Sequence, residues 1–129
     1  IGSVATPFEY KTYGQELAAC QRYYSKSYNP DVAPATSGAA GACSSLAIYS
    51  SGSQSLGARW VTSMRTAPAV VIYPTGSTNT GYVTQTSNNV EVAATASEIG
   101  MSGFQYLSGS LPNTAANGVR FHWSADAEL

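Results

Sequence analysis

Apolar and polar residues alternate with a period of two along several short stretches of this chain, the pattern of strands with one buried face. The alternation is clearest in Val119–Ala127, where one face carries Val119, Phe121, Trp123, Ala125 and Ala127. The other face carries Arg120, His122, Ser124 and Asp126. The sequence therefore predicts a strand here, with Phe121 and Trp123 in the core.

Two more apolar runs, Trp60–Met64 and Ala69–Tyr73, predict neighbouring central strands. In the first run the alternation places Trp60 and Met64 on one face, and core packing is the better interpretation of both than contact with a ligand. The second run is apolar at every position, which predicts a strand buried on both faces. Pro68 lies between them and has no N–H to donate, so it belongs at a strand start or bend.

Shorter β-prone stretches follow one another at intervals of about ten residues, separated by Gly, Ser, Asn and Pro. They are Gln21–Tyr28, Ala42–Ser50, Gly81–Thr86, Val90–Ala96 and Gly103–Leu107. A hairpin turn is predicted at Ser87–Asn89 and one short helical turn at Gly14–Cys20. This pattern predicts an all-β fold, an antiparallel β-sandwich of jelly-roll or Greek-key type. We expect residues 1–15 to be an extended lead-in from an upstream domain, and residues 16–129 to form the sandwich.

Composition narrows the class of protein. Charged residues make up 10% of the 129 residues, against about 25% in an average soluble domain. The polar surface must then come mostly from Ser, Thr, Asn, Gln and Tyr, which favours a virion or extracellular protein. The net charge of −1 gives no electrostatic footprint for nucleic acid, and no apolar run approaches the roughly 20 residues of a membrane span. Because the sequence starts Ile-Gly-Ser, without Met or a signal peptide, we expect it to be the C-terminal piece of a longer protein.

The residues that carry chemistry are few. Cys20 and Cys43 leave two alternatives open, one disulfide bond or two small buried thiols. They lack the paired spacing of metal ligands, so we expect neither a metal nor a cofactor. His122, Ser124 and Asp126 share a face, but same-face neighbours on a strand lie about 7 Å apart, too far for a hydrogen-bonded triad. With no GxSxG elbow and no distinctive pair of carboxylates, no enzyme is predicted.

Three segments, ELAACQRYY at Glu16–Tyr24, MRTAPAVVIY at Met64–Tyr73 and FHWSADAEL at Phe121–Leu129, together resemble the C-terminal domain of bacteriophage tail fibres, tailspikes and related virion proteins. The resemblance runs from about Glu16 to the end of the chain. It implies a β-sandwich, often assembled as a trimer, at the tip of an elongated fibre. It also implies a role in binding host-surface glycans or in closing the trimer, without supplying a set of binding residues.

Tyrosine is the side chain of most interest for glycan binding, because it offers an apolar face and a hydroxyl. Among the nine tyrosines, Tyr49 and Tyr82 lie beside polar, glycine-containing turns and are the candidates for carbohydrate binding. The polar face with Arg120, His122 and Asp126 has two interpretations. It is a solvated face of a monomer, or it lines a trimer interface where Arg120 or His122 pairs with an acidic side chain of a neighbour. We favour the interface.

The resulting prediction is a non-catalytic C-terminal receptor-binding domain of a phage tail fibre or tailspike, located on the virion and extracellular when it acts. Its expected partners are a bacterial surface polysaccharide or lipopolysaccharide, two further copies in a homotrimer and the upstream fibre domain, with no nucleic acid and no membrane insertion. Trimerisation would multiply a weak affinity through effective concentration. The alternatives are a structural trimerisation or capping module without a ligand, and a domain that hydrolyses or deacetylates polysaccharide.

Overall fold

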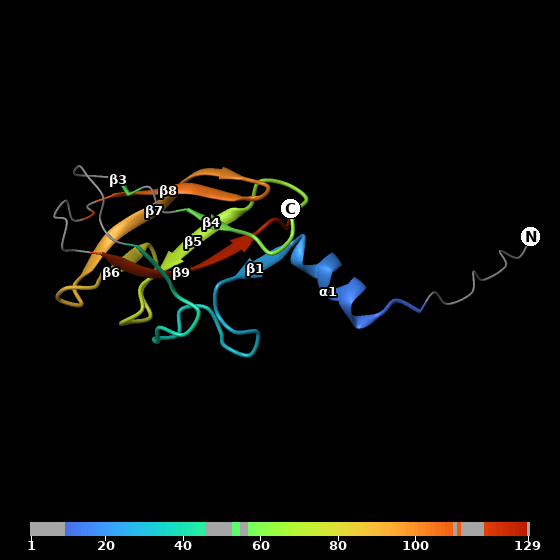
Figure 1. Cartoon of the computed structure of the whole chain (residues 1–129), viewed down its shortest axis with the longest axis horizontal. Coiled ribbons are helices and arrows are strands. Elements are labelled where there is room, and N and C mark those ends of the chain that lie inside the picture. Colours follow the sequence, from blue (N-terminus) through green and yellow to red (C-terminus); the bar gives the residue numbers. More distant parts are fainter. Residues whose placement is uncertain (1–9, 46–52, 55–56, 110, 112–117, 129) are drawn as a thin grey trace, which may run out of the picture.

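The computed structural model describes residues 10–45, 53–54, 57–109, 111 and 118–128 (Figure 1). This part of the chain contains one helix, α1, and nine strands. Their bounds are α1 Tyr13–Gln21, β1 Tyr24–Lys26, β2 Cys43–Ser45, β3 Ser53–Gln54, β4 Ala58–Arg59, β5 Ala69–Tyr73, β6 Tyr82–Gln85, β7 Glu91–Gly100, β8 Gly103–Gly109 and β9 Val119–Asp126. Within these residues no helix has the length and hydropathy needed to span a bilayer.

Strand β9 is the centre of the sheet. It pairs with β1 and β2 along one edge and with β5 and β6 along the other. From β6 the sheet continues through β7 to β8, whose far edge carries β3 and β4. Every pair is antiparallel, so the all-β antiparallel prediction is confirmed. The strands form one hydrogen-bonded sheet, and the sandwich or jelly-roll form of the prediction is not confirmed.

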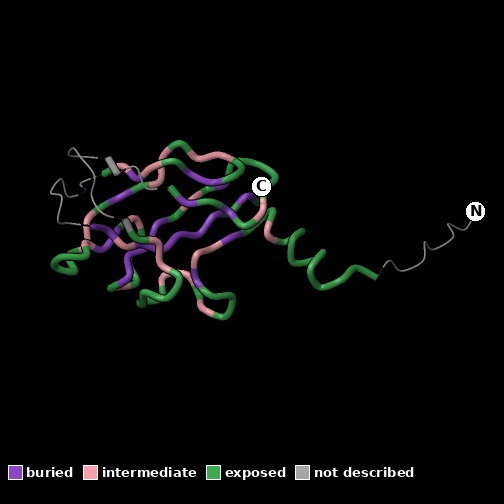
Figure 2. Tube along the Cα trace, viewed as in Figure 1, coloured by how far each residue is buried: buried purple, intermediate pink, exposed green. Residues whose placement is uncertain are grey.

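The sheet curls around its core, so that residues following β4 meet β9. The Trp60 ring lies 4.7 Å from the Trp123 ring and 6.0 Å from the Phe104 ring, measured between centroids. Phe104 in turn lies 6.2 Å from Phe121. All four residues are buried, and the buried stretches of the chain gather at the centre of the sheet in Figure 2. The predicted core positions Trp60, Phe121 and Trp123 are therefore confirmed.

The predicted strand Trp60–Met64 is wrong, although its two buried side chains are correct. The segment after β4 hydrogen-bonds to the β7–β8 hairpin instead of forming a strand: the Trp60 N–H donates to the Ser102 carbonyl at 3.1 Å. The Met64 N–H donates to the Met101 carbonyl at 2.8 Å. Trp60 and Met64 face the core, whereas Val61 between them is 76% exposed. These two hydrogen bonds hold the segment after β4 against the turn between β7 and β8.

Other predicted strands are largely confirmed. Val119–Ala127 corresponds to β9, and Gly103–Leu107 lies in β8. The start of Ala42–Ser50 is β2, while its residues 46–50 lie outside the described residues. The prediction that Ala69–Tyr73 is buried on both faces is wrong for its first half, because only Ile72 and Tyr73 of β5 are buried.

Strand β7 is longer than the predicted Val90–Ala96 because it continues to Gly100. Its alternation changes phase at Glu98, which has a left-handed φ of 55°. As a result Ala96 and Ile99, three residues apart, both pack against the core. A left-handed conformation is uncommon for a residue other than glycine, and no pattern in the sequence marks it.

Helix α1 extends away from the sheet (Figure 1). Thr12 caps it with a complete capping box: its hydroxyl accepts from the Gln15 N–H, and the Gln15 side chain accepts from the Thr12 N–H. The predicted short helical segment Gly14–Cys20 is thus confirmed and is slightly longer. The helix spans residues 15 and 16, where the domain boundary was predicted; that boundary stays a prediction.

Candidate functional site

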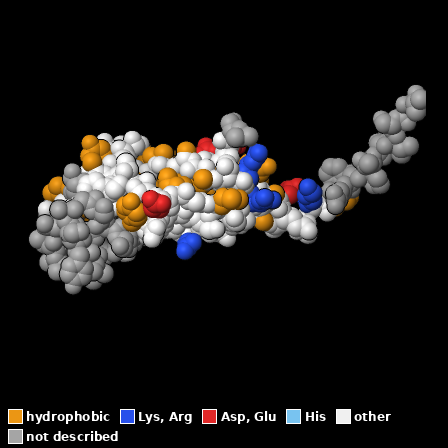
Figure 3. All heavy atoms as spheres, turned by 90° about the horizontal axis from the view of Figure 1, so that it is seen from above, with side chains coloured by type: hydrophobic (Ala, Val, Ile, Leu, Met, Phe, Trp, Pro, Cys, Tyr) orange, Lys and Arg blue, Asp and Glu red, His pale blue; other side chains and the backbone are white. Residues whose placement is uncertain are grey.

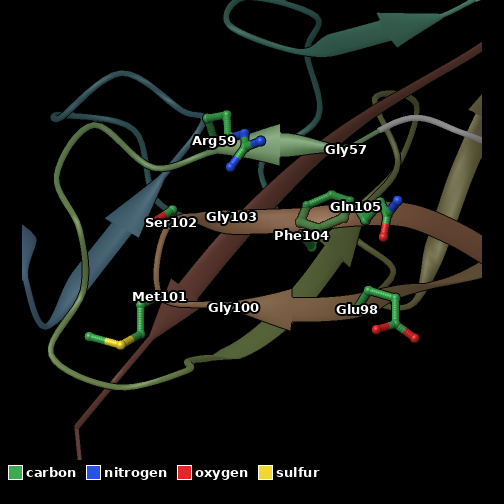
Figure 4. Close-up of a pocket in the computed structure, with 9 residues that line it drawn as sticks. All are labelled: Gly57, Arg59, Glu98, Gly100, Met101, Ser102, Gly103, Phe104 and Gln105. Carbon is green, nitrogen blue, oxygen red and sulfur yellow. The ribbon is translucent and has the colours of Figure 1, made fainter.

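A groove of about 510 Å³ lies on the outer side of the β7–β8 hairpin, beside β4 (Figure 4). Its lining residues come from these three strands, from the residue before β4 and from the turn that joins β7 to β8. They are Gly57, Arg59, Glu98, Gly100, Met101, Ser102, Gly103, Phe104 and Gln105. We call this the hairpin groove.

The hairpin groove exists because glycines face one another across neighbouring strands. Gly103 of β8 pairs with Gly100 on one side and with Arg59 on the other. At Gly103, which has a φ of 153°, a Cβ atom would lie 2.2 Å from the Ala58 carbonyl oxygen. A side chain is therefore excluded at this position, and the floor of the groove is bare backbone.

Polar side chains surround this floor. Figure 4 shows Arg59 on the β4 side, with Glu98 and Gln105 on β7 and β8. All three residues are exposed. The Arg59 guanidinium and the Glu98 carboxylate have no hydrogen-bonding or ionic partner among the described residues. An arginine offers up to five donors, a carboxylate accepts, and a glutamine amide does both. The groove can thus bind a ligand rich in hydroxyl groups.

Glu98 adds a second indication of a site. Residues in sparsely populated backbone conformations cost of order 1–3 kcal/mol each, and they cluster where ligands bind. Glu98 has a left-handed backbone and lines the hairpin groove.

The two tyrosines predicted to bind carbohydrate do not line the hairpin groove. Tyr49 lies outside the described residues. Tyr82 is 39% exposed on β6, where it pairs with Ala93, and it is absent from the lining. The aromatic residue that does line the groove, Phe104, is buried in the core. Sequence reasoning missed Arg59 and Gln105, because their grouping depends on the pairing of β4 with β8.

His122 occupies a second, smaller site. His122 is 1% exposed. The Tyr28 ring stacks on the imidazole, with the ring centroids 3.9 Å apart and an angle of 15° between the ring planes. His122 Nε2 lies 3.0 Å from the Gly38 carbonyl oxygen, and Nδ1 lies 2.9 Å from the Ser27 hydroxyl oxygen. Because a carbonyl only accepts, Nε2 carries the proton, and neutral Nδ1 accepts from Ser27. Burial lowers the pKa of His122, with the Gly38 hydrogen bond acting in the opposite direction.

The Ser27–His122 pair resembles part of a nucleophile–base arrangement, but its surroundings indicate a structural role. The Ser27 hydroxyl oxygen also accepts from the Trp123 N–H at 3.0 Å, so it joins β1 to β9. A cavity of about 170 Å³ adjoins His122 and Tyr28, and Ser27 is not among its lining residues. A nucleophile needs access to its substrate, and this serine has none from that cavity.

The polar face of β9 differs from the prediction. His122 and Ser124 are buried by their own chain: the loop that contains Tyr28 and Gly38 covers the first, and Tyr73 shares a hydrogen bond of 3.0 Å with the second. The interpretation of this row as solvated is therefore wrong at these two positions. Asp126 is exposed, which fits both the solvated face and the interface.

Arg120 and Asp126 keep part of their side chains at the surface. Arg120 Nη2 donates to Asn89 Oδ1 at 2.8 Å, which links β9 to the β6–β7 turn. Asp126 Oδ1 accepts from the Glu128 N–H at 2.8 Å. That Arg120, His122 and Asp126 lie at a subunit interface stays a prediction, and His122 would reach a neighbour only if its covering loop moved.

Cys20 and Cys43 are both free thiols. Cys20 is exposed on α1 and Cys43 is partly buried in β2. The prediction of two buried thiols thus fails for Cys20. Burial raises the pKa of the Cys43 thiol. In the part of the chain that the structure describes, no group of three or more His, Cys, Asp or Glu side chains could hold a metal ion.

Comparisons with models of protein families, with curated proteins and with solved structures give no significant match. The resemblance to phage tail fibres therefore stays a prediction from the three sequence segments.

Proposed function

We propose that this chain is a non-catalytic C-terminal domain of a phage tail fibre or tailspike that binds host cell-surface carbohydrate in the hairpin groove. The observation that carries the carbohydrate part is the backbone floor at Gly100 and Gly103, bordered by polar side chains. Two of these, Arg59 and Glu98, have no partner among the residues that the structure describes. The fibre part depends on the three segments that resemble tail-fibre domains.

The groove chemistry suits a polysaccharide or lipopolysaccharide glycan. A sugar presents hydroxyl groups that both donate and accept, and Arg59, Glu98 and Gln105 together offer both functions. Because Gly100 and Gly103 have no side chains, a sugar ring can approach the backbone of the groove floor. The surface composition supports the same class of ligand: the face in Figure 3 is mostly white, meaning backbone and uncharged polar side chains, with scattered charges. Such a site binds weakly, and several copies on one fibre strengthen it.

The test is binding of the full chain to an array of bacterial capsular polysaccharides and lipopolysaccharides. Arg59→Ala is expected to lower the affinity for any bound glycan about tenfold or more, because a hydrogen bond from a charged group contributes about 1.5–3 kcal/mol. Arg65→Ala is the matched control. It removes the same charge from a residue outside the groove, whose guanidinium lies 5.2 Å from the Tyr23 ring centre. We expect it to bind as the original chain does.

Three results separate the parts of this proposal. A blank array for the original chain would contradict glycan binding. Binding that is unchanged in Arg59→Ala but lost in Tyr82→Ala would move the site to the predicted tyrosine. Release of a shortened or deacetylated product from a bound polysaccharide would contradict the non-catalytic assignment.

A structural role in fibre assembly is the second candidate, and one observation favours it. Helix α1 buries none of its residues against the described part of the chain, which leaves its surface open to a partner in the fibre.

A further inference from the structure

Helix α1 is encoded by the sequence but buries no residue against the described part of its own chain. A complete capping box fixes its start, yet none of its residues is buried. Figure 2 shows the helix exposed, and only its last residue, Gln21, is partly covered. Isolated helices shorter than about 12–15 residues are marginal in water, and most helical stability in proteins comes from packing of an apolar face. A helix of 9 residues therefore needs a partner surface.

The apolar residues of α1 that are larger than alanine lie along one stripe. Tyr13, Leu17 and Cys20 are spaced by four and three residues, which is the a/d spacing of a heptad. Tyr13 is 81% exposed and Leu17 is 42% exposed, and Cys20 is exposed as well. Tyr10 and Tyr24 continue the same spacing before and after the helix, and both are exposed. We call Tyr13, Leu17 and Cys20 the α1 seam.

The residues beside the α1 seam favour an identical helix as the partner. In a parallel coiled coil the g position of one helix lies beside the following e position of its neighbour. If Leu17 occupies position a, Glu16 occupies position g and Gln21 occupies the following position e. Glu16 of one helix then lies beside Gln21 of the next helix, and two like charges do not meet. Gln21 Oε1 accepts from the Thr62 hydroxyl at 3.4 Å, which leaves the Gln21 amide protons free to donate to a Glu16 carboxylate. A copy of this chain thus supplies both the apolar and the polar complement.

We propose that α1 associates in parallel with α1 of other copies of this chain through Tyr13, Leu17 and Cys20. This assigns the contact surface of the homotrimer that belongs to the proposed function. The assembly surface lies on α1 and the glycan site lies on the hairpin groove, so each proposal can fail without the other.

Cys20 reports this geometry directly, because d-position side chains of neighbouring helices face each other. In a Cys43→Ala background, mild oxidation of the full chain is expected to give a Cys20–Cys20 cross-linked species in high yield. The matched control combines Cys20→Ser with Ala18→Cys, which moves the thiol to the opposite side of the helix. It is expected to cross-link at least tenfold more slowly. Equal rates for the two variants, or no cross-link from Cys20, would overturn the parallel seam.

Leu17→Asp tests assembly without chemistry. By analytical ultracentrifugation the original chain is expected to have about three times its monomer mass of 13.4 kDa, and Leu17→Asp to be monomeric. Ala18→Asp is the control and keeps the oligomer. A monomeric original chain, or an unchanged oligomer in Leu17→Asp, would overturn the proposal.

Near-ultraviolet circular dichroism of Trp60 and Trp123 checks that each variant is folded, because these rings lie in the sheet core. Arg59→Ala on the same instrument stays oligomeric, so a glycan-site failure is distinguished from an assembly failure.

Discussion

Replacing Trp60 with alanine is expected to lower the free energy of unfolding by about 4 kcal/mol, since Trp→Ala changes in cores cost about 3–5 kcal/mol. The indole lies 4.7 Å from the Trp123 ring and donates from Nε1 to the Gly100 carbonyl at 3.1 Å. The variant loses this packing and leaves the partly buried Gly100 carbonyl without this donor. Urea denaturation followed by circular dichroism measures the change. With a slope of about 2 kcal/mol/M, the midpoint falls by about 2 M.

Val61→Ala is the matched control for Trp60, because Val61 is the next residue and points to solvent. Its expected effect is within about 0.5 kcal/mol, as for most surface substitutions. Comparable losses from the two variants would mean that this segment does not pack as described. A Trp60→Ala protein of unchanged stability that no longer binds glycan would mean that the indole stacks on sugar rather than on the core.

This pair of residues also shows what the sequence pattern can and cannot predict. Alternation correctly identified Trp60 as a core residue, because a pattern reports which side chains prefer burial. It was wrong about the backbone, since the Trp60 N–H bonds to Ser102. That partner is remote in sequence, and no local signal announces it. In β9, by contrast, the core face and the strand itself were both predicted correctly.

The polar face of β9 was misjudged for a related reason. Alternation assigns a residue to a face, but it does not say what covers that face. His122 and Ser124 lie on the predicted side, yet the loop around Tyr28 and Gly38 buries the first, and Tyr73 helps to bury the second. The covering loop is rich in Pro and Gly, and its sequence predicts a loop but not where it docks.

The hairpin groove was beyond sequence prediction because it is made by absent side chains. Gly103 and Gly100 are close in the sequence, and glycine is common in turns. That Arg59 pairs with Gly103 on the other side depends on the register of β4 against β8. The left-handed Glu98 is also invisible to propensity, because glycine, asparagine and aspartate are the residues that usually adopt that conformation.

His122→Ala is expected to lower the free energy of unfolding by about 3 kcal/mol at pH 8. The substitution removes two hydrogen bonds, and each net bond contributes about 1 kcal/mol. It also removes the ring that stacks on Tyr28, a contact of about 0.5–1.5 kcal/mol. Denaturant unfolding measures the loss. Arg120→Ala, on the same strand and partly exposed, is expected to lose less than half as much.

The same histidine makes stability depend on pH. Burial lowers the pKa of His122 in the folded protein, whereas the unfolded chain titrates near 6.5. Above pH 6.5 both states are neutral and the full stability is present. Below pH 6.5 the unfolded state binds a proton that the folded state does not. The free energy of unfolding therefore decreases as the pH is lowered, by up to about 1.4 kcal/mol per pH unit, until the pH reaches the pKa of His122 in the folded protein.

His122→Phe isolates this contribution, because the chain has one histidine and phenylalanine keeps a ring against Tyr28 without titrating. The free energy of unfolding is measured for both proteins between pH 8 and pH 5, and their difference cancels the contributions of the other groups. The original chain is expected to lose stability faster than His122→Phe below pH 6.5. Parallel curves would show that the folded state accepts the proton, so that His122 is not held neutral between Ser27 and Gly38 as described.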